Sequence, residues 1–507
     1  MHMQAVLKDR YFLVILLSAA IFTVYWTAYG IYRYNNFLDN YYDIGALMSS
    51  LYVHIHCLNF APDFQYLVVS NHIAPLMLLL VPAFALYQSP ATLFFIQSAF
   101  LALTALAIYL IANSLIKSSK ISFALSFAFL INPGVRGLTM FDVHTEAFIP
   151  LFYILAFYFF WKGNRRYFGL SYILLLCTVD IAFFIGLTLL VGLFLFELLY
   201  DRKGKDRFHN RVKMIIAGIA ITAVFALFYY SLGAYLTSHY NTAPYSSVPR
   251  IYTYINFISY QLHALNSPNV VPINGNSNEV IAFYGTLGLF VIFLGFGMTS
   301  FVSPVISLAL LSPWIGEVFI LRNSSFPVLE YQYYGTIIGA SFVASLMGIL
   351  ILKERKSLLS KFIKYDDRLE SILFASILSL IFAISAVTFP FAIIGSTLGL
   401  SGAPALNYTQ VNNAIAMIPH NMSVLAQQDI APHLFYECNL QVPPSAQSQF
   451  FNKINLTISN PDYVIVDKQL HGYAGVVDSN PSVPDYVRSN YSVFYNQSGI
   501  TIYKRSD

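Results

Sequence analysis

Long apolar runs alternate with short polar segments along most of this 507-residue chain. A run of about 20 apolar residues can form a helix that crosses the roughly 30 Å hydrocarbon core of a bilayer. Runs that predict such helices cover residues 11–31, 91–116, 121–140, 146–161, 214–236, 279–300, 302–321, 332–352 and 371–395. The pattern therefore predicts a polytopic α-helical membrane protein.

Residues 167–200 form one more apolar block, which is too long for a single crossing. Basic clusters flank both of its ends, and lysine and arginine collect on the cytoplasmic side of membrane proteins. Two basic ends on one side predict a hairpin of two short helices with Asp180 near its turn. The total is then about eleven spans.

The basic clusters also set the predicted orientation in the plasma membrane. They share one side when the N-terminus is cytoplasmic, which places the loop 32–90 and everything after residue 396 outside. Residues 72–87 are apolar but contain Pro75 and Pro82, so we expect a helix in or dipping into the outer leaflet instead of a span. Asn-x-Ser/Thr triplets support this topology because they all fall in predicted outer segments, at Asn323, Asn407, Asn421, Asn455, Asn490 and Asn496.

Composition changes after the last predicted span. The segment 401–507 is polar and contains strand-like runs at 423–426, 463–466, 492–495 and 500–503. Gln497, Ser498 and Gly499 mark the turn of a terminal hairpin. We therefore expect a transmembrane domain over 1–400 and a small extracytoplasmic α/β domain over 401–507.

The overall composition supports the membrane class. Hydrophobic residues make up 57% of the chain and charged residues only 10%, whereas soluble domains average about 25% charged. The net charge of +4 is concentrated in short loops, so it indicates topology and not a nucleic-acid partner. The three cysteines are far apart and predict neither a disulfide framework nor a metal-binding cysteine cluster.

Carboxylates and histidines follow the first span directly, in the segment 38–75. Asp39 and Asp43 are one helical turn apart if this segment is helical, and His54, His56, Asp63 and His72 follow them. The segment is too polar to cross lipid, and we expect one or two short juxtamembrane helices. It is a candidate active face, although an ordinary hydrated loop would have the same residue types.

Three further groups of polar residues are predicted to face outward. Asp142, His144 and Glu146 would lie within about one and a half helical turns, where the two acids share a face and hold a divalent metal such as Mg²⁺ or Mn²⁺, or cap the next helix. Asp180 is an acid within apolar sequence, and it either reaches water or a partner or caps a helix at the hairpin turn. Charged residues in outer loops that could meet a phosphate are Arg250, His263, Arg322 and Glu330.

No Walker loop, dinucleotide fingerprint, serine elbow or HExxH motif is present, which argues against nucleotide-driven pumping and the common hydrolases. Several other segments resemble the prokaryotic membrane-protein family known as domain of unknown function 2079. They are YYDIGALMSSLY, SNHIAPLMLLLVPAFALYQSPATLFFIQSAF, INPGVRGLTMFDVHTEAFIPLFYILAFYF and VNNAIAMIPHNMSVLAQQDIAPHLFYE. EYQYYGTIIGASFVASLMGI resembles the family's His-Tyr-x-Tyr helix start, which implies a substrate-binding role for Tyr333.

That family is in turn similar to membrane glycosyltransferases of the GT-C superfold, in which a first outer loop carries a catalytic acid. The resemblance implies that Asp43 is this acid and that His72 is the histidine of the family's His-x-x-Pro motif. It also implies that Asp142, His144 and Glu146 form the second outer-loop cluster. The donor would be a polyprenyl-phosphate-linked sugar that enters from the membrane lipid.

Asp180 corresponds to the last acid of a Lys-Glu-Asp-like turn in the family. This chain has Thr178 and Val179 before it, so the lysine and glutamate that would bind phosphate are missing. Phosphate recognition at this turn is therefore in doubt.

These observations predict a glycosyltransferase that acts on the outer face of the membrane. Asp43 would be the general base, Asp39, His72, His144, Asp180, Arg250, Arg322 and Tyr333 would contact substrate, and Asp142 and Glu146 would hold the metal. The alternative is a non-catalytic transporter or lipid-binding membrane protein, which would need polar residues along a path through the bilayer. A third hypothesis is a surface interaction protein that its helices anchor in the membrane, but anchoring alone does not need eleven spans.

Overall fold

The computed structural model of the chain describes residues 8–39, 41–56, 68–69, 72–200, 205–240, 278–320, 329, 332–354, 365–398, 408–420, 422–426, 430–437, 440–441, 461–467 and 489–506. The chain forms two compact units. The first unit comprises Met1–Thr27, Phe95–Ser231 and Val248–Ala392. The second comprises Ala28–Phe94, Leu232–Ser247 and Ile393–Asp507, so it combines the first predicted outer loop with the C-terminal region.

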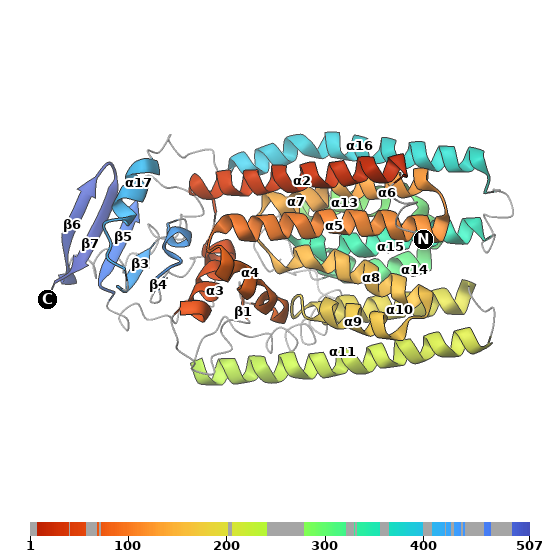
Figure 1. Cartoon of the computed structure of the whole chain (residues 1–507), viewed down its shortest axis with the longest axis horizontal. Helices are drawn as coiled ribbons and strands as arrows, with labels where there is room; N and C mark the ends of the chain where they lie inside the picture. Colours follow the sequence, from red (N-terminus) through yellow and green to blue (C-terminus); the bar gives the residue numbers. More distant parts are fainter. Residues whose placement is uncertain are drawn as a thin grey trace. The chain divides into compact units, whose positions relative to one another are not determined.

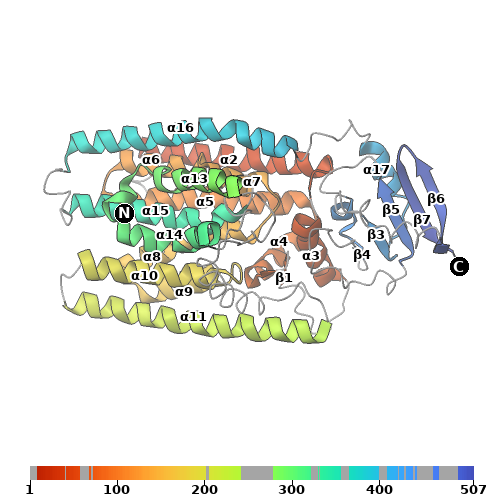
Figure 2. The same ribbon diagram turned by 180° about the vertical axis from the view of Figure 1, so that it is seen from behind.

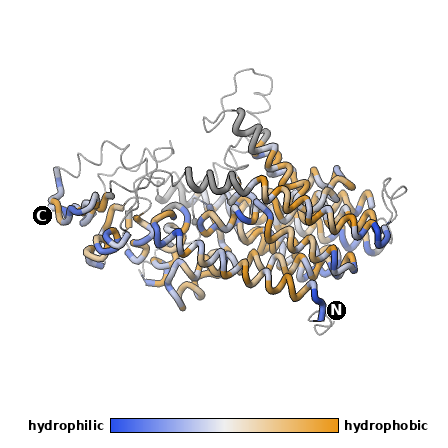
Figure 3. The backbone as a smooth tube through the Cα atoms, turned by 90° about the horizontal axis from the view of Figure 1, so that it is seen from above, coloured by the Kyte–Doolittle hydropathy of each residue, from blue (hydrophilic) through white to orange (hydrophobic). Residues whose placement is uncertain are grey.

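The first unit is helical, and its long helices lie side by side (Figure 1). Hydrophobic residues cover most of their length (Figure 3). The helices that contribute to it are α2 (Arg10–Asn35), α5 (Pro90–Ile116), α6 (Ser119–Leu130), α7 (Pro133–Met140), α8 (Ile149–Lys162), α9 (Arg165–Leu176), α10 (Ala182–Tyr200), α11 (Lys205–Tyr240), α13 (Asn278–Leu294), α14 (Pro304–Ile315), α15 (Gly335–Lys353) and α16 (Asp367–Leu398). Its short helical turns are η4 (Thr145–Phe148), η5 (Thr299–Val302), η6 (Gly316–Ile320) and η7 (Gln332–Tyr334).

Among the described residues, six helices are long and apolar enough to cross a membrane, or seven if the bent pair α6 and α7 forms one span. The six are α2, α5, α10, α11, α15 and α16. Every apolar run that predicts a span contains a described helix, but α8, α9, α13 and α14 have only 12 to 17 residues. A multi-pass membrane protein is confirmed, whereas the count of about eleven spans is not.

The break between α6 and α7 has a local cause. The two helices meet at 40°, and Pro133 begins α7, where its missing N–H costs no helical hydrogen bond. The Asn132 side chain accepts a hydrogen bond from the Gly134 N–H at 2.8 Å and so caps the new helix. The chain therefore changes direction just before the segment that carries Asp142.

Helix α15 is the most enclosed helix of the first unit. Every residue from Gly335 to Leu352 is buried, and the helix packs against α8, α14 and η5. Small residues permit this close packing, because a Cβ on Gly348 would overlap the carbonyl oxygen of Thr299. The site residues near the start of α15 are therefore held by a rigid central helix.

The predicted hairpin over residues 167–200 is confirmed. Helices α9 and α10 are joined by a turn of five residues that contains Asp180. The hydroxyl groups of Tyr172 on α9 and Thr222 on α11 form a hydrogen bond at 2.7 Å, which joins the hairpin to α11.

In the second unit, a short helical segment follows the end of α2, as the sequence predicts. A π-helical turn, η1 (Tyr41–Gly45), leads directly into α3 (Ala46–His56). The strands β1 (Val68–Val69) and β2 (His72–Ile73) form an antiparallel pair, and η3 (Pro75–Leu80) and α4 (Val81–Leu86) follow. Residues 75–86 are therefore helical but shorter than a span.

The small C-terminal sheet of the second unit is confirmed. It consists of β3 (Val424–Ala426), β4 (Leu440–Gln441), β5 (Tyr463–Asp467), β6 (Tyr491–Gln497) and β7 (Ile500–Arg505), in the order β4-β3-β5-β7-β6. Strand β3 pairs in parallel with β4 and β5, and β7 pairs antiparallel with β5 and β6 (Figure 2). Helix α17 (Tyr408–Ile415) and the turn η9 (Ala431–Leu434) complete a buried apolar core with this sheet.

The terminal hairpin forms where the sequence places it. Ser498 and Gly499 connect β6 and β7 with φ angles of 54° and 87°. Two residues with positive φ are typical of the turn that matches the twist of a two-stranded hairpin.

Candidate functional site

Two segments carry the predicted acids, and they belong to different units. The first acid segment, residues 39–45, lies in the second unit and contains Asp39 and Asp43. The second acid segment, residues 141–148, lies in the first unit and contains Asp142, His144 and Glu146. Arg250, His263, Arg322, Glu330 and Asp63 lie outside the described residues.

The first acid segment is positioned by the end of α2. The helix ends at Asn35, and Phe37 adopts a left-handed backbone conformation with φ of 56°. An L-residue in this conformation costs roughly 1–2 kcal/mol, so tertiary contacts must stabilise it. Asp39 follows in non-helical backbone, where its carboxylate lies 3.3 Å from the Arg33 guanidinium.

Asp43 is the third residue of η1, the next helical segment. Its side chain is only 8% exposed, and its neighbour Ile44 is fully buried. The expectation that Asp39 and Asp43 share a helical face is wrong, because Asp39 precedes the helix that contains Asp43.

Aromatic rings join the first acid segment to the C-terminal part of the second unit. The His433 ring of η9 stacks on Phe37 and Tyr34 with centroid distances of 3.9 and 4.1 Å. The Tyr34 hydroxyl also donates a hydrogen bond to the Pro432 carbonyl at 3.0 Å. These contacts hold Phe37 in its left-handed conformation, and η1 packs against η9 beside them.

Burial of the His433 ring lowers its pKa from 6.5 to about 3, although a hydrogen bond to the Tyr34 backbone opposes the shift. The ring is therefore neutral at physiological pH. It is a packing element of the junction and not a cationic ligand.

The second acid segment is organised by an amide from α5. Gln97 Nε2 donates hydrogen bonds to the carbonyl oxygens of Leu138 and Asp142 at 2.9 and 3.4 Å. Its Oε1 accepts a hydrogen bond from the His144 N–H at 2.8 Å. Residues 141–144 are therefore non-helical, and the expected i, i+4 helical face of Asp142 and Glu146 is wrong.

The structure brings His144 and Glu146 together. The His144 Nδ1 lies 3.7 Å from Glu146 Oε2, which also accepts a hydrogen bond from the Thr145 hydroxyl at 3.0 Å. Glu146 is 1% exposed, and within the described residues its Oε1 has no hydrogen-bond partner. A buried carboxylate oxygen in this state can accept a hydrogen bond from a ligand.

The backbone of this segment abuts the start of α15. A Cβ on Gly335 would overlap the Glu146 carbonyl oxygen, so only glycine fits at this contact. Tyr333 lies in the adjacent turn η7, and its carbonyl accepts a hydrogen bond from Thr336 at 2.6 Å. η7 packs against α7 and η4, so Tyr333 lies on an element that contacts the second acid segment.

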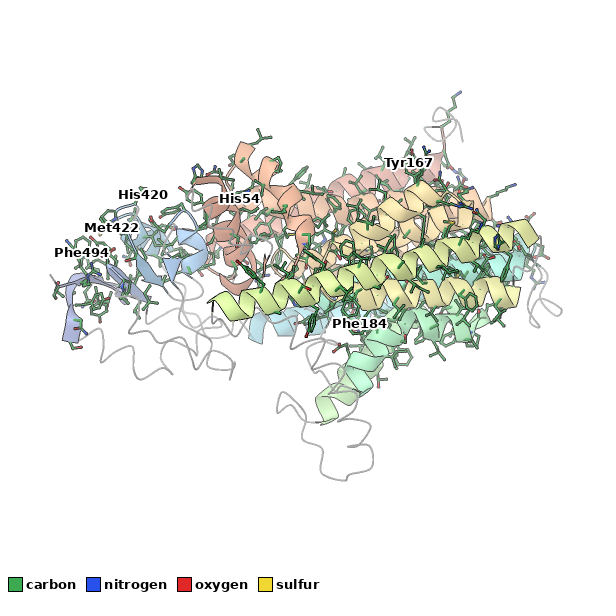
Figure 4. The ribbon with its side chains drawn as sticks, turned by 90° about the horizontal axis from the view of Figure 1, so that it is seen from below. His54, Tyr167, Phe184, His420, Met422 and Phe494 are labelled. Carbon is green, nitrogen blue, oxygen red and sulfur yellow. The ribbon has the colours of Figure 1, made fainter. Side chains whose placement is uncertain are left out.

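Asp180 is 3% exposed in the turn between α9 and α10. The nearby Tyr229 hydroxyl of α11 donates a hydrogen bond to the Leu176 carbonyl, which fixes this end of the hairpin. His72 is partly buried on β2, and His54 is partly buried on α3 (Figure 4). The substrate-binding roles of Asp180 and His72 stay predictions.

Asp142 and Glu146 are the predicted metal ligands. In the part of the chain that the structure describes, no three His, Cys, Asp or Glu side chains are arranged to hold a metal ion. Asp142 and Glu146 thus do not have a third such ligand among these residues. The role of a divalent metal stays a prediction.

Sequence reasoning missed Gln97 and His433. Gln97 was the one amide within the apolar run FFIQSAF, and a buried polar residue in a span is a signal for a polar contact. His433 lies in APHLF, which gives no such signal, since its partners are almost 400 residues away.

Comparison with known proteins agrees with the motifs. Among curated proteins, none matches this chain. A family described as predicted membrane protein, domain of unknown function 2079, matches residues 33–502 and therefore covers both acid segments and most of the C-terminal sheet. The chain thus belongs to the membrane-protein family of domain of unknown function 2079.

Proposed function

We propose that the protein is a GT-C-like glycosyltransferase with about eleven spans that transfers a sugar from a polyprenyl-phosphate donor to an acceptor on the outer face. The observation that carries the proposal is Asp43, a carboxylate that is only 8% exposed in a π-helical turn shortly after the first span. π-helical turns within helices are frequent at functional sites. A buried acid next to a membrane span is costly to retain without a function.

In this mechanism the Asp43 carboxylate accepts the proton of an acceptor hydroxyl. The acceptor oxygen attacks the anomeric carbon, the bond from that carbon to the phosphate oxygen breaks, and polyprenyl phosphate leaves. Direct displacement inverts the anomeric configuration. General-base assistance of this kind contributes about 10² to 10⁴ in rate.

The role of His144 is the next step of the proposal. Its ring lies beside the Glu146 carboxylate, and a ring N–H would donate a hydrogen bond to the leaving phosphate. Asp142 and Glu146 would then orient His144, and a divalent metal, if one binds, would supply positive charge.

The test is turnover in liposomes. The purified chain is mixed with polyprenyl-phosphate sugars that are labelled in the sugar, with a membrane extract as the acceptor source. We expect the label to leave the lipid fraction only when the protein is present, with an inverted anomeric linkage in the product. A donor that binds but keeps its label would contradict the proposal and favour the lipid-binding alternative.

A further inference from the structure

The first unit also contains a cavity that is lined by basic residues. It has a volume of about 640 Å³ and is formed by the end of α8 and the first turns of α11. Its lining residues are Trp161, Lys162, Gly163, Arg207, Asn210 and Arg211. Besides Arg211, the lining contains the cationic residues Lys162 and Arg207 and no acidic residue, so the cavity favours an anion.

One wall of the cavity is a buried ion pair. Arg211 and Glu197 are each almost fully buried and form a direct hydrogen-bonded pair, and Arg211 Nη2 donates to the Trp161 carbonyl at 2.7 Å. The Arg211 guanidinium also lies 5.4 Å from the centre of the Trp161 ring. Glu197 balances the charge of Arg211, so this wall is rigid and nearly neutral.

Exposed cationic side chains form the outer part of the cavity. Lys162 and Arg207 are both exposed, and they approach the cavity from the end of α8 and the start of α11. Arg165 adds a third cation next to it, because its Nε donates a hydrogen bond to Asn210 at 2.5 Å. Gly163 ends α8 in a left-handed conformation and lines the cavity.

Apolar side chains begin immediately beyond this charged rim. On α9, Tyr167 and Leu170 are each 54% exposed (Figure 4). On α11, Ile216 and Ile219 are exposed about two and a half to three and a half turns after Arg207. A change from exposed cations to exposed apolar side chains along the same helices marks the depth of lipid headgroups.

We propose that this cavity binds the phosphate headgroup of an anionic phospholipid, with Lys162 and Arg207 as its phosphate contacts. The acyl chains would lie along the exposed apolar residues of α9 and α11. Basic pockets between membrane helices on the predicted cytoplasmic side bind anionic headgroups in this way. The site is independent of the proposed sugar transfer.

The test is binding measured by native mass spectrometry and by the unfolding temperature in a neutral detergent. The ligands are phosphatidylglycerol, zwitterionic phosphatidylcholine and inorganic phosphate. We expect phosphatidylglycerol to bind and raise the unfolding temperature, and the other two to have no such effect. Equal effects of both lipids would overturn the proposal, and an equal effect of inorganic phosphate would show an anion site without a lipid.

Variants locate the site. The double variant Lys162→Gln and Arg207→Gln should bind phosphatidylglycerol about 30-fold more weakly. Lys213→Gln is the matched control, since Lys213 is exposed on the same helix but does not line the cavity, and it should change binding by less than about twofold. An unfolding temperature measured without lipid checks that the double variant is folded. Unchanged lipid binding by this variant would overturn the proposal.

Discussion

The two acid segments are held in place by different forces. Polar contacts organise the second acid segment, where the single amide of Gln97 bonds three backbone groups. Aromatic packing organises the first, where His433 stacks on two rings at the end of α2. Both segments keep their acids buried, and among the described contacts those of the first segment include residues from the distant C-terminal region.

This difference indicates which changes each segment tolerates. A hydrogen-bonded turn inside a helical bundle fails when one partner is lost, because the remaining buried groups stay unsatisfied. A stacked aromatic junction tolerates ring-for-ring exchange but responds to charge on the ring. The predictions below use these two sensitivities.

The largest effect is expected for Gln97→Leu. The substitution removes the partner of three backbone groups, and each unsatisfied buried group costs about 1–3 kcal/mol, so we expect a loss of roughly 3 kcal/mol in unfolding free energy. Denaturant unfolding in mixed micelles measures it. Gln88→Leu is the control, since Gln88 contacts the exposed His56 of the second unit and should change stability little.

A smaller effect is expected for Gly335→Ala. The new methyl group would overlap the Glu146 carbonyl, and overpacking of this kind costs about 1–3 kcal/mol. Gly169→Ala on α9 is the matched control, because an added Cβ there would have ample space. Its unfolding free energy should be unchanged or higher. Equal unfolding temperatures for the two variants would show that the second acid segment can shift away from α15.

The smallest effect concerns pH and the first acid segment. The pKa of His433 is about 3 when folded and near 6.5 when unfolded, so the unfolded state binds more protons between these values. Stability is full above about pH 6.5 and falls as the pH decreases, by at most about 1.4 kcal/mol per pH unit. Because the ring keeps part of its surface exposed, we expect less than this limit.

His433→Phe should retain the stacking and remove this pH dependence. The measurement is unfolding, or protease resistance of the C-terminal region, at pH 7 and pH 5. His420→Phe is the control, because His420 is 76% exposed beside Glu437 and the variant should retain the sensitivity to acid (Figure 4). A variant at His433 that loses stability in acid as wild type does would rule out this histidine as the cause.

Much of the fold follows from the sequence because its signals are local. Apolar length predicts the spans, basic ends predict the α9–α10 hairpin, and the residues before Ile500 predict the terminal turn. Local signals failed at both acid segments. Phe37 ends α2 because its ring contacts His433, and residues 141–144 stay extended because Gln97 binds their backbone.

Helical spacing was therefore the wrong guide to which acids share a face. At the two acid segments, distant contacts decide where the helical backbone ends, and local sequence patterns do not reveal such contacts. The identities of the acids and histidine in the two segments were predictable, whereas the His144–Glu146 contact and the separate setting of Asp39 required the fold.

The central claim is that Asp43 is a general base, and Asp43→Asn tests it most directly. The variant keeps the shape of the side chain and removes its charge, so the account predicts that sugar transfer from polyprenyl phosphate falls by about 10² to 10⁴ while the unfolding temperature stays near that of wild type. Asp39→Asn is the comparison variant, because Asp39 contacts Arg33 and is predicted to contact substrate without accepting its proton, so this variant should lower the rate less than Asp43→Asn does. Wild-type transfer by Asp43→Asn, with or without a loss in Asp39→Asn, would contradict the assignment.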